Sequence, residues 1–337
     1  MQFSHAHFLI CRTDNIGDVV LTLPLAGFLK QRYPDCRISF LCRTYAEAVV
    51  RQCIFVDFVI CEESLSDPVA QLKVGGYHCV IFAYPQRKLA RAAKQAGIAR
   101  RVGSSHRLYH WLYCNHLAHF SRVRSNLHEA QLNFSLLKPL GLTHTPSPAE
   151  IMTFYGLRTD QAKPPDLDPA RFHLILHPKS NGNGREWPLS HYIELARQLQ
   201  ATKQIQIWLT GSAAEASLLA QAAPQLLALP NVRSVAGQMS LAELTQWIGH
   251  CDGLIASGTG PLHLAAALGR SALGLFPPLK PIDPARWGAL GIRAENLCLA
   301  QTCNACKDAG TCECMAALSV EQVRAVVLGW LQQAGWH

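Results

Sequence analysis

The sequence predicts an α/β protein with two domains, each built on a parallel sheet. Three observations predict this: apolar runs alternate with helical patterns in the first half, the alternation stops in a proline-rich segment, and it then starts again. Strands separated by helical patterns form βαβ units, which build parallel sheets. The length of 337 residues fits about two domains.

Each half supplies its own series of elements. Strands are expected at 8–11, 38–41, 58–61, 79–82, 101–103, 172–177, 205–210, 232–235, 253–256 and 272–276. Helices are expected at 21–32, 45–52, 128–140, 188–200, 213–222 and 261–268. Capping boxes that begin at Ser240 and Ser319 open two more helices, the last running to about Trp330.

The segment 143–169 is rich in proline and polar residues and is predicted to be a linker with one short strand at 151–155. The domains are therefore expected to be 1–160 and 170–318, two Rossmann-like units facing across a cleft, followed by a closing helix in 319–337. Neither half carries Gly-x-Gly-x-x-Gly after its first strand, and no P-loop motif occurs. This argues against a dinucleotide-dependent dehydrogenase and a P-loop enzyme.

The N-terminus has no basic segment before its first apolar run, which is only a few residues long, so no secretory signal is expected. We predict a cytoplasmic protein, with a peripheral position on the inner membrane left open. In such a compartment most of the thirteen cysteines are expected to be reduced core residues.

Asp18 follows the first predicted strand, inside the run Arg12-Thr-Asp-Asn-Ile-Gly17-Asp18. In open α/β sheets, ligands bind at the carboxyl ends of the strands, so this carboxylate is a candidate for chemistry. Its alternative role is to complement the dipole of the helix that begins there.

Positive charge is concentrated in the first half. Residues 68–128 contain no Asp or Glu, but ten Lys or Arg and six His. A field of one sign attracts anions, here nucleic acid, an anionic membrane surface or a phosphorylated acceptor, unless the run is simply a solvated face. We assign acceptor binding to five of these cations: Arg87, Lys88, Arg91, Arg101 and Arg107.

Three stretches of the second half follow strands and are expected to meet at one sheet edge. The first, 177–188, is rich in Gly and Asn and carries Lys179, Ser180 and Arg185. Arginine can grip a phosphate with two parallel hydrogen bonds, although a surface loop with solvated cations would look the same.

The second stretch holds Ser212 and Glu215, which fit a capping box; Glu215 could instead accept hydrogen bonds from ribose hydroxyls. The third, 257–263, places two glycines before a helix whose N-terminus suits a phosphate. Its candidate residues are Gly258, Thr259, Gly260 and His263, although the histidine could also be a packing residue. Together the stretches predict a diphosphate cradle.

In their order and spacing these motifs resemble glycosyltransferase family 9, the bacterial heptosyltransferases of lipopolysaccharide core assembly. The resemblance rests on Gly17-Asp18-Val with Pro24, on Arg185-Glu-Trp187-Pro188, and on Thr259-Gly-Pro-Leu-His263. It also includes Gly237 with Ser240-Leu-x-Glu-Leu244, and Cys314-Met315 before Leu318-Ser-Val-Glu321.

The resemblance implies a GT-B fold, with an N-terminal acceptor domain, a C-terminal nucleotide-sugar domain and a last helix that returns to the N-terminal domain. It implies inverting transfer without a metal or other required cofactor, most simply of heptose from ADP-heptose to the lipid A core. Asp18 matches the catalytic base. Arg185 takes the place of a Lys that contacts the donor phosphate in the family, and Ser180 lies where relatives carry a hydroxyl near the phosphates. Glu215 matches an acid near the nucleotide ribose, and Thr259, Gly260 and His263 match the loop around the diphosphate. One departure is Gly258, where the family has an Asp associated with the donor sugar.

Rival functions remain at this stage. A nucleotide-sugar epimerase or hydrolase on the same fold would need no acceptor, and a non-catalytic relative would bind nucleotide without consuming the sugar. No recognition motif supports nucleic-acid binding. Separately, Cys303, Cys306, Cys312 and Cys314 could hold a structural zinc ion, although the Cys-x-Cys pair is tighter than usual for such sites.

Overall fold

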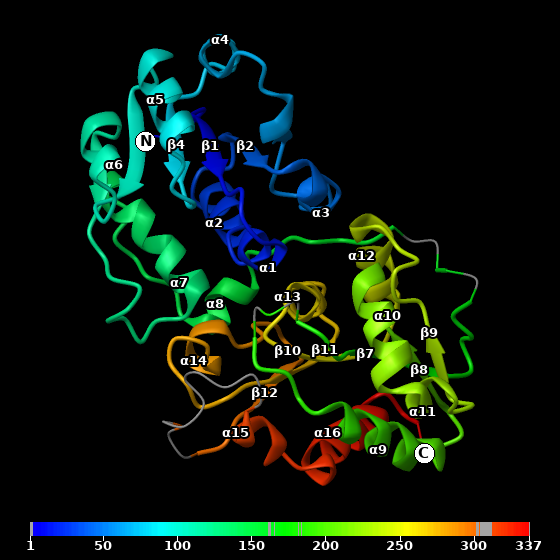
Figure 1. The fold of residues 1–337 in the computed structure, drawn as a ribbon. Coiled ribbons are helices and arrows are strands. Elements are labelled where there is room, and N and C mark those ends of the chain that lie inside the picture. Colours follow the sequence, from blue (N-terminus) through cyan, green and yellow to red (C-terminus); the bar gives the residue numbers. More distant parts are fainter. Residues whose placement is uncertain are drawn as a thin grey trace. The chain divides into compact units, whose positions relative to one another are not determined.

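The computed structural model describes residues 3–160, 163–164, 166–180, 182, 184–300, 303 and 312–336. The chain divides into two compact units, Met1–Arg158 and Thr159–His337 (Figure 1). The boundary lies inside the predicted proline-rich linker, near the expected end of the first domain.

The described part of the first unit contains one parallel six-stranded sheet, in the order β3-β2-β1-β4-β5-β6. Its strands are β1 (His7–Cys11), β2 (Arg37–Cys42), β3 (Phe58–Cys61), β4 (Cys79–Phe82), β5 (Arg100–Ser104) and β6 (His116–Ala118). Its helices are α1 (Ile16–Val20), α2 (Pro24–Arg32), α3 (Glu47–Arg51), α4 (Pro68–Val74), α5 (Arg87–Gln95), α6 (Leu108–Tyr113), α7 (Glu129–Phe134) and α8 (Pro148–Met152). Short 3₁₀ helices lie at Thr44–Ala46, Glu62–Ser64 and Ser135–Leu140.

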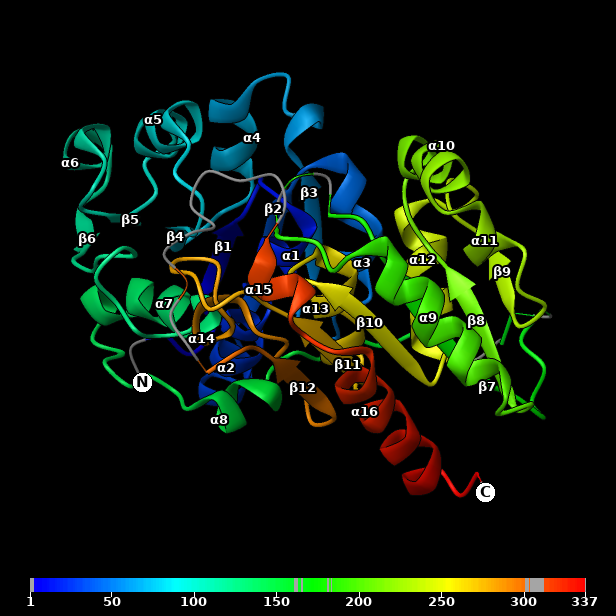
Figure 2. The same ribbon diagram turned by 60° about the horizontal axis from the view of Figure 1, so that its bottom comes forward.

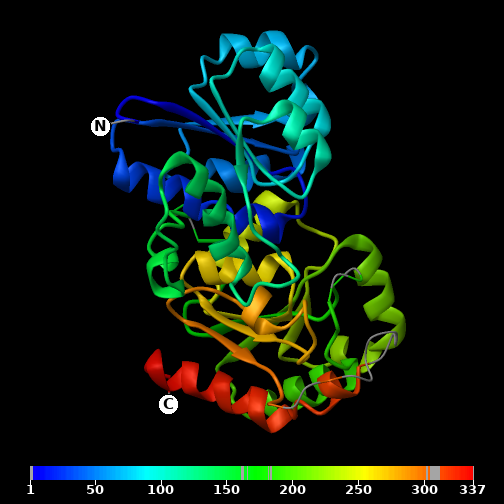
Figure 3. The ribbon, with the colours of Figure 1, turned by 90° about the vertical axis from the view of Figure 1, so that its left-hand side faces the viewer.

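Both faces of the first sheet are covered at β1, which is buried along its whole length and apolar from Phe8 to Cys11. Leu9 and Cys11 pack in a core with residues of α4 and α5. Phe8 points the other way, with its ring 5.4 Å from that of Phe3. Figure 3 shows the cyan helices and the blue helix α2 on opposite faces of this sheet.

The described part of the second unit repeats this topology, with the parallel order β12-β11-β10-β7-β8-β9. Its strands are β7 (Phe172–His177), β8 (Ile205–Leu209), β9 (Val232–Ser234), β10 (Gly253–Ser257), β11 (Ser271–Leu275) and β12 (Ala294–Leu297). Its helices are α9 (Leu189–Gln200), α10 (Ala213–Ala222), α11 (Pro224–Leu227), α12 (Leu241–His250), α13 (Gly260–Ala267), α14 (Pro284–Trp287), α15 (Glu313–Ala316) and α16 (Val320–Gln333).

In each sheet the strand order reverses direction once, between β1 and β4 and between β7 and β10. Ligands of doubly wound sheets bind outside the carboxyl ends of the strands at such a switch point. The segments after these four strands are therefore the places to examine for a site.

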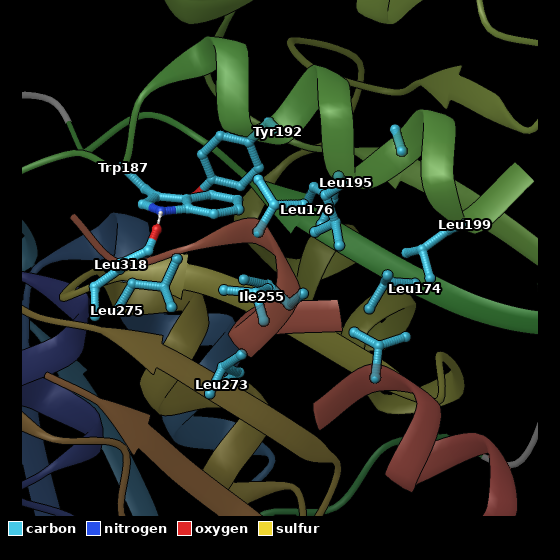
Figure 4. Close-up of a cluster of buried hydrophobic side chains, with 14 of the residues drawn as sticks. Leu174, Leu176, Trp187, Tyr192, Leu195, Leu199, Ile255, Leu273, Leu275 and Leu318 are labelled. Carbon is cyan, nitrogen blue, oxygen red and sulfur yellow. Dashed lines mark hydrogen bonds between the residues drawn. The ribbon is translucent and has the colours of Figure 1, made fainter. Parts of the chain in front are cut away.

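A core cluster of the second unit packs α9 and α16 against β7, β10 and β11 (Figure 4). Trp187 is 1% exposed, stacks edge-to-face on Tyr192, and donates its indole N–H to the carbonyl of Leu318 at 2.8 Å. The end of the 177–188 segment is thereby fixed to the core.

The apolar residues of α16 pack within the second unit, where the helix lies beside α9 (Figure 2). Trp330 of α16 packs directly against the first residue of β10, because a Cβ on Gly253 would lie 2.8 Å from the indole ring of Trp330. The expectation that 319–337 returns to the N-terminal domain stays a prediction.

Several details differ from the sequence-based expectation. The predicted strand at 151–155 is wrong: Ser147 and Glu150 form a capping box that opens α8, with Pro148 in its first turn. The single helix expected at 128–140 is α7 followed by a 3₁₀ turn, which ends at Gly141 with φ 84°. The short edge strands β6 and β12 were not expected.

No helix in the described ranges is long and apolar enough to cross a membrane.

Candidate functional site

The first half of the candidate site is built around Arg12, which directly follows β1. Its side chain is 3% exposed, and its guanidinium donates to both carboxylate oxygens of Asp14, at 2.7 and 2.9 Å. It also donates to the carboxylate of Asp18 and, at 3.2 Å, to the carbonyl of Ala83 after β4. Arg12 thus connects the segments that follow β1 and β4 at the switch point of the sheet.

A further carboxylate, Glu129 at the start of α7, lies 3.9 Å from the Arg12 guanidinium and is 1% exposed. Arg122 pairs with Glu129 at 3.1 Å. Asn133, one turn further along α7, accepts a 3.4 Å hydrogen bond from Arg12. Arg12 therefore lies close to three carboxylates, and Glu129 is one that also pairs with Arg122.

This environment raises the pKa of Asp18 to about 6. Burial is the largest cause; the Arg12 guanidinium lowers the pKa, while the charges of Asp14 and Glu129 raise it again. Asp18 is 13% exposed. A carboxylate of this kind is ionised at neutral pH but more basic than an ordinary Asp, as general-base catalysis requires.

Sequence reasoning found Asp18 but missed Arg12, Asp14 and Glu129 as its partners. Asp14 and Arg12 stand in the same motif, so their clustering at the end of β1 could have been anticipated. Glu129 lies more than a hundred residues away, and only the fold brings it beside them.

The predicted acceptor-binding cations do not all behave alike. Arg87, Lys88 and Arg91 are exposed on α5. The preceding residue, Gln86, donates a 2.9 Å hydrogen bond to Thr13, so α5 begins at the same sheet edge as Asp18. The helix that carries Arg87, Lys88 and Arg91 therefore starts near the segment that contains Asp18.

Arg107 is exposed at the start of α6. Arg101 instead donates to the carbonyls of Ile98 and Tyr113, the latter at 2.7 Å. Those bonds give Arg101 a structural role between β5 and α6.

In the second unit, the segment after β7 is organised by Glu186. Its carboxylate accepts hydrogen bonds from the Lys179 ammonium, from the backbone N–H of Ser180 at 2.8 Å and from the Ser180 hydroxyl at 3.1 Å. Ser180 also exchanges hydrogen bonds with the backbone of Gly184. Glu186 thus holds Lys179 and Ser180 together, a role that sequence reasoning did not assign to it although its motif was quoted.

The segment after β10 lies against the segment after β7. A Cβ on Gly184 would be 3.4 Å from the carbonyl oxygen of Gly258, so the two backbones approach closely. Thr259 precedes the first turn of α13, is 8% exposed, and its hydroxyl has no hydrogen-bond partner among the described residues. A buried hydroxyl of this kind beside a helix N-terminus is suited to an anionic ligand.

His263 lies in the first turn of α13 and is 3% exposed. Gly258 has its own constraint: a Cβ there would lie 2.8 Å from the ring of Phe276. The aromatic ring thus fills the space next to the position where the family has Asp.

The segment after β8 is joined to that after β7 by a 2.9 Å hydrogen bond between His177 Nδ1 and the Thr210 hydroxyl. Burial lowers the pKa of His177 to about 4, although Glu215 and Glu186 act in the opposite direction. The histidine is neutral at physiological pH. Glu215 forms the expected capping box, with its Oε2 accepting from Ser212 N at 2.7 Å.

The three predicted stretches thus converge, because β10, β7 and β8 are neighbouring strands. Of the four cysteines predicted as possible zinc ligands, Cys306 lies outside the described residues. Cys303, Cys312 and Cys314 are buried in the core cluster of the second unit. No group of metal-binding side chains is found within the described ranges.

Comparison with known proteins identifies the family. Residues 72–316 match the model of glycosyltransferase family 9 (heptosyltransferase). A Haemophilus influenzae protein with a provisionally assigned glycosyltransferase activity is 25% identical over 297 residues, covering 83% of this chain and 84% of that protein. The lipopolysaccharide heptosyltransferase 2 of Escherichia coli is 33% identical over 106 residues, covering 30% of this chain and 29% of its own.

The fold is similar to that of the E. coli ADP-heptose lipopolysaccharide heptosyltransferase II, with a TM-score of 0.73 at 19% identity, covering 98% of this chain and 99% of the other. This likeness shows a GT-B type fold. The family match shows that the chain belongs to glycosyltransferase family 9 and is a glycosyltransferase.

Proposed function

We propose that this glycosyltransferase moves heptose from ADP-heptose onto the inner core of lipopolysaccharide at the cytoplasmic face of the inner membrane, with inversion at the anomeric carbon. The observation that carries the proposal is Asp18, which is 13% exposed, hydrogen-bonded to Arg12 and raised in pKa to about 6, a value that suits a general base at neutral pH. The named relatives supply the choice of donor and acceptor.

In the proposed step, an acceptor hydroxyl oxygen attacks the anomeric carbon and its proton passes to the Asp18 carboxylate. The bond between that carbon and the donor's phosphate oxygen breaks, and ADP leaves with the electron pair. Arg12 holds Asp18 in place and stabilises its ionised form. General-base assistance of this kind contributes about 10²–10⁴-fold to the rate.

The developing charge on the diphosphate would be met in the second unit. Lys179, Arg185 and the Thr259 hydroxyl, with the N-terminus of α13, are the proposed donors to it. Ser180, Gly260 and His263 line the same loops. The capping bonds of Glu215 go to Oε2, so Oε1 is the oxygen we assign to a ribose hydroxyl.

The exposed cations Arg87, Lys88, Arg91 and Arg107 would attract an anionic glycolipid acceptor. Arg101 contributes to the local field but is committed to backbone carbonyls. No metal or other cofactor takes part in the proposed step.

The test is release of ADP from ADP-heptose, with and without a deacylated lipopolysaccharide-core acceptor. Release that depends on the acceptor supports the proposal. Release without acceptor favours a hydrolase, and rearranged sugar without an acceptor favours an epimerase. Nucleotide binding without turnover across ADP-, UDP- and GDP-sugars favours a non-catalytic relative, the alternative that Gly258 keeps open.

A further inference from the structure

Helix α6 exposes the side of its surface that an ordinary surface helix buries. Leu108, Trp111 and Leu112 occupy positions i, i+3 and i+4, which lie on one helix face. They are 87, 57 and 63% exposed. The fully buried side chain of this helix is instead a histidine, His110.

The orientation of α6 is fixed by that histidine. His110 Nδ1 is 2.8 Å from the carbonyl oxygen of Ser104, and its ring stacks near Phe82 with centroids 6.1 Å apart. The space is filled closely, since a Cβ on Gly103 would lie 2.7 Å from the imidazole. The indole N–H of Trp111 donates to the Ser105 carbonyl at 2.9 Å, which holds the outward ring in place. The apolar face therefore points outward because of specific contacts.

Basic side chains lie just before α6 and on the helix beside it. Helix α6 packs beside α5 (Figure 1), and the Lys94 ammonium of α5 donates to the Leu112 carbonyl at 2.9 Å. Arg91 is exposed on the same helix and Arg107 just before α6. Both helices lie in the segment 68–128, which contains no carboxylate side chain.

We propose that α6 is a membrane-docking element whose face of Leu108, Trp111 and Leu112 enters the headgroup region of an anionic phospholipid bilayer. Tryptophan and leucine partition into this region, and flanking Lys and Arg are attracted to its negative charge. A second copy of the chain fits less well, because pairing two such faces would bring two basic surfaces together.

The proposal deepens the proposed function by giving the enzyme a way to reach a lipid-borne acceptor, and it rests on that function only for the identity of the acceptor. Vesicle binding can be measured without turnover. Turnover can be measured on a deacylated acceptor without vesicles. Failure of either idea is therefore visible separately.

The experiment is co-sedimentation of the full chain with vesicles of phosphatidylglycerol in phosphatidylethanolamine, and with vesicles of phosphatidylcholine alone. We expect binding to the anionic vesicles that weakens with salt. The triple variant Leu108→Ser, Trp111→Ser, Leu112→Ser should bind at least about tenfold more weakly. The matched control is Leu218→Ser with Ile292→Ser, which removes apolar side chains 52 and 81% exposed in the second unit and should bind like wild type.

A second measurement, quenching of tryptophan fluorescence, reports whether the Trp111 ring enters the bilayer. Trp111 is the exposed member of the seven tryptophans, so vesicles should protect it from an aqueous quencher, and Trp111→Phe should remove the protected signal. If the triple variant has a lowered melting temperature, the pair Leu108→Ser and Leu112→Ser keeps the Trp111 hydrogen bond and serves in its place.

The proposal fails if wild type does not bind anionic vesicles, if the variants bind as well as wild type, or if Trp111 stays accessible to the quencher. It also fails if the variants lose turnover on the deacylated acceptor, since α6 would then belong to the acceptor site. Self-association that the variants abolish would assign the face to a second copy.

Discussion

The guanidinium of Arg12 donates to the carboxylate of Asp18 while it also holds both oxygens of Asp14. One buried cation therefore organises two acids of the same turn and reaches a third, Glu129, from a distant helix. The negative charges of Asp14 and Glu129 add to the effect of burial and raise the pKa of Asp18 to about 6, although Arg12 lowers it. The following predictions begin from this arrangement.

Asp18→Asn should reduce turnover by about 10²–10⁴-fold, because an amide cannot accept the proton of the attacking hydroxyl. Nucleotide affinity should change little, since the donor loops belong to the other unit. Steady-state kinetics and nucleotide titration calorimetry measure the two effects. Loss of nucleotide binding with the fold intact would contradict the role given to Asp18.

The same substitution should stabilise the protein in alkaline solution. The folded-state pKa of Asp18 is about 6, against 3.8 as the ordinary value, so the native state binds the proton more tightly than the unfolded state. Ionised Asp18 therefore costs stability above pH 6, by about 3 kcal/mol for this shift, and the cost disappears below pH 4. Urea unfolding at pH 8 and pH 4 should show a gain for Asp18→Asn only at pH 8. An equal change at both pH values would exclude this linkage.

Arg12→Gln should shift the acid limb of the kcat/KM profile to higher pH, because Arg12 lowers the pKa of Asp18. Activity should fall more at pH 6 than at pH 8. Removing one partner of a buried ion pair also costs about 3–5 kcal/mol of stability. Arg12→Lys keeps the charge and should leave the acid limb nearer its original position. The control is Arg43→Gln, which removes an exposed cation paired with Glu63. An unshifted limb in Arg12→Gln would separate Arg12 from the base.

Thr259→Val should leave the melting temperature unchanged or raise it, since the buried hydroxyl gains no hydrogen bond within the described protein. The KM for the nucleotide sugar should rise about tenfold if this hydroxyl donates to the diphosphate. Thr245→Val is the matched control, because its buried hydroxyl donates to the Leu241 carbonyl and its loss should affect stability instead of KM. Unchanged donor kinetics in Thr259→Val would remove Thr259 from the donor site.

Gly258→Ala should destabilise the protein by about 1–3 kcal/mol, because the new Cβ would lie 2.8 Å from the Phe276 ring. Adding Phe276→Leu should recover part of the loss by vacating that space. Gly329→Ala is the control, since nothing lies within 4 Å of the position of its Cβ and the helix should gain stability. Thermal unfolding of the single and double variants gives the coupling, and additive effects would show that Phe276 does not constrain residue 258.

Much of the fold could be predicted from local sequence. The strands β3, β4 and β7 match their predicted bounds: β4 and β7 are buried at every residue, and β3 is an apolar run at the sheet edge, where Phe58 is 51% exposed. The edge strands β6 and β12 could not be predicted in this way, since they are three and four residues long and carry polar side chains. The strand expected at 151–155 failed because the capping box at Ser147 fixes a helix start there.

By itself, the sequence determined the two α/β units, the position of Asp18 at a strand end, and the loops that follow β7, β8 and β10. These depend on periodicity and on turn residues, which act over a few positions. Only the tertiary structure decided that Arg12, Asp18 and Glu129 share one buried network, that Phe276 stands beside Gly258, and that α6 turns its apolar face outward. Those relationships join distant segments through packing and desolvation, and neither is encoded in the spacing of neighbouring residues.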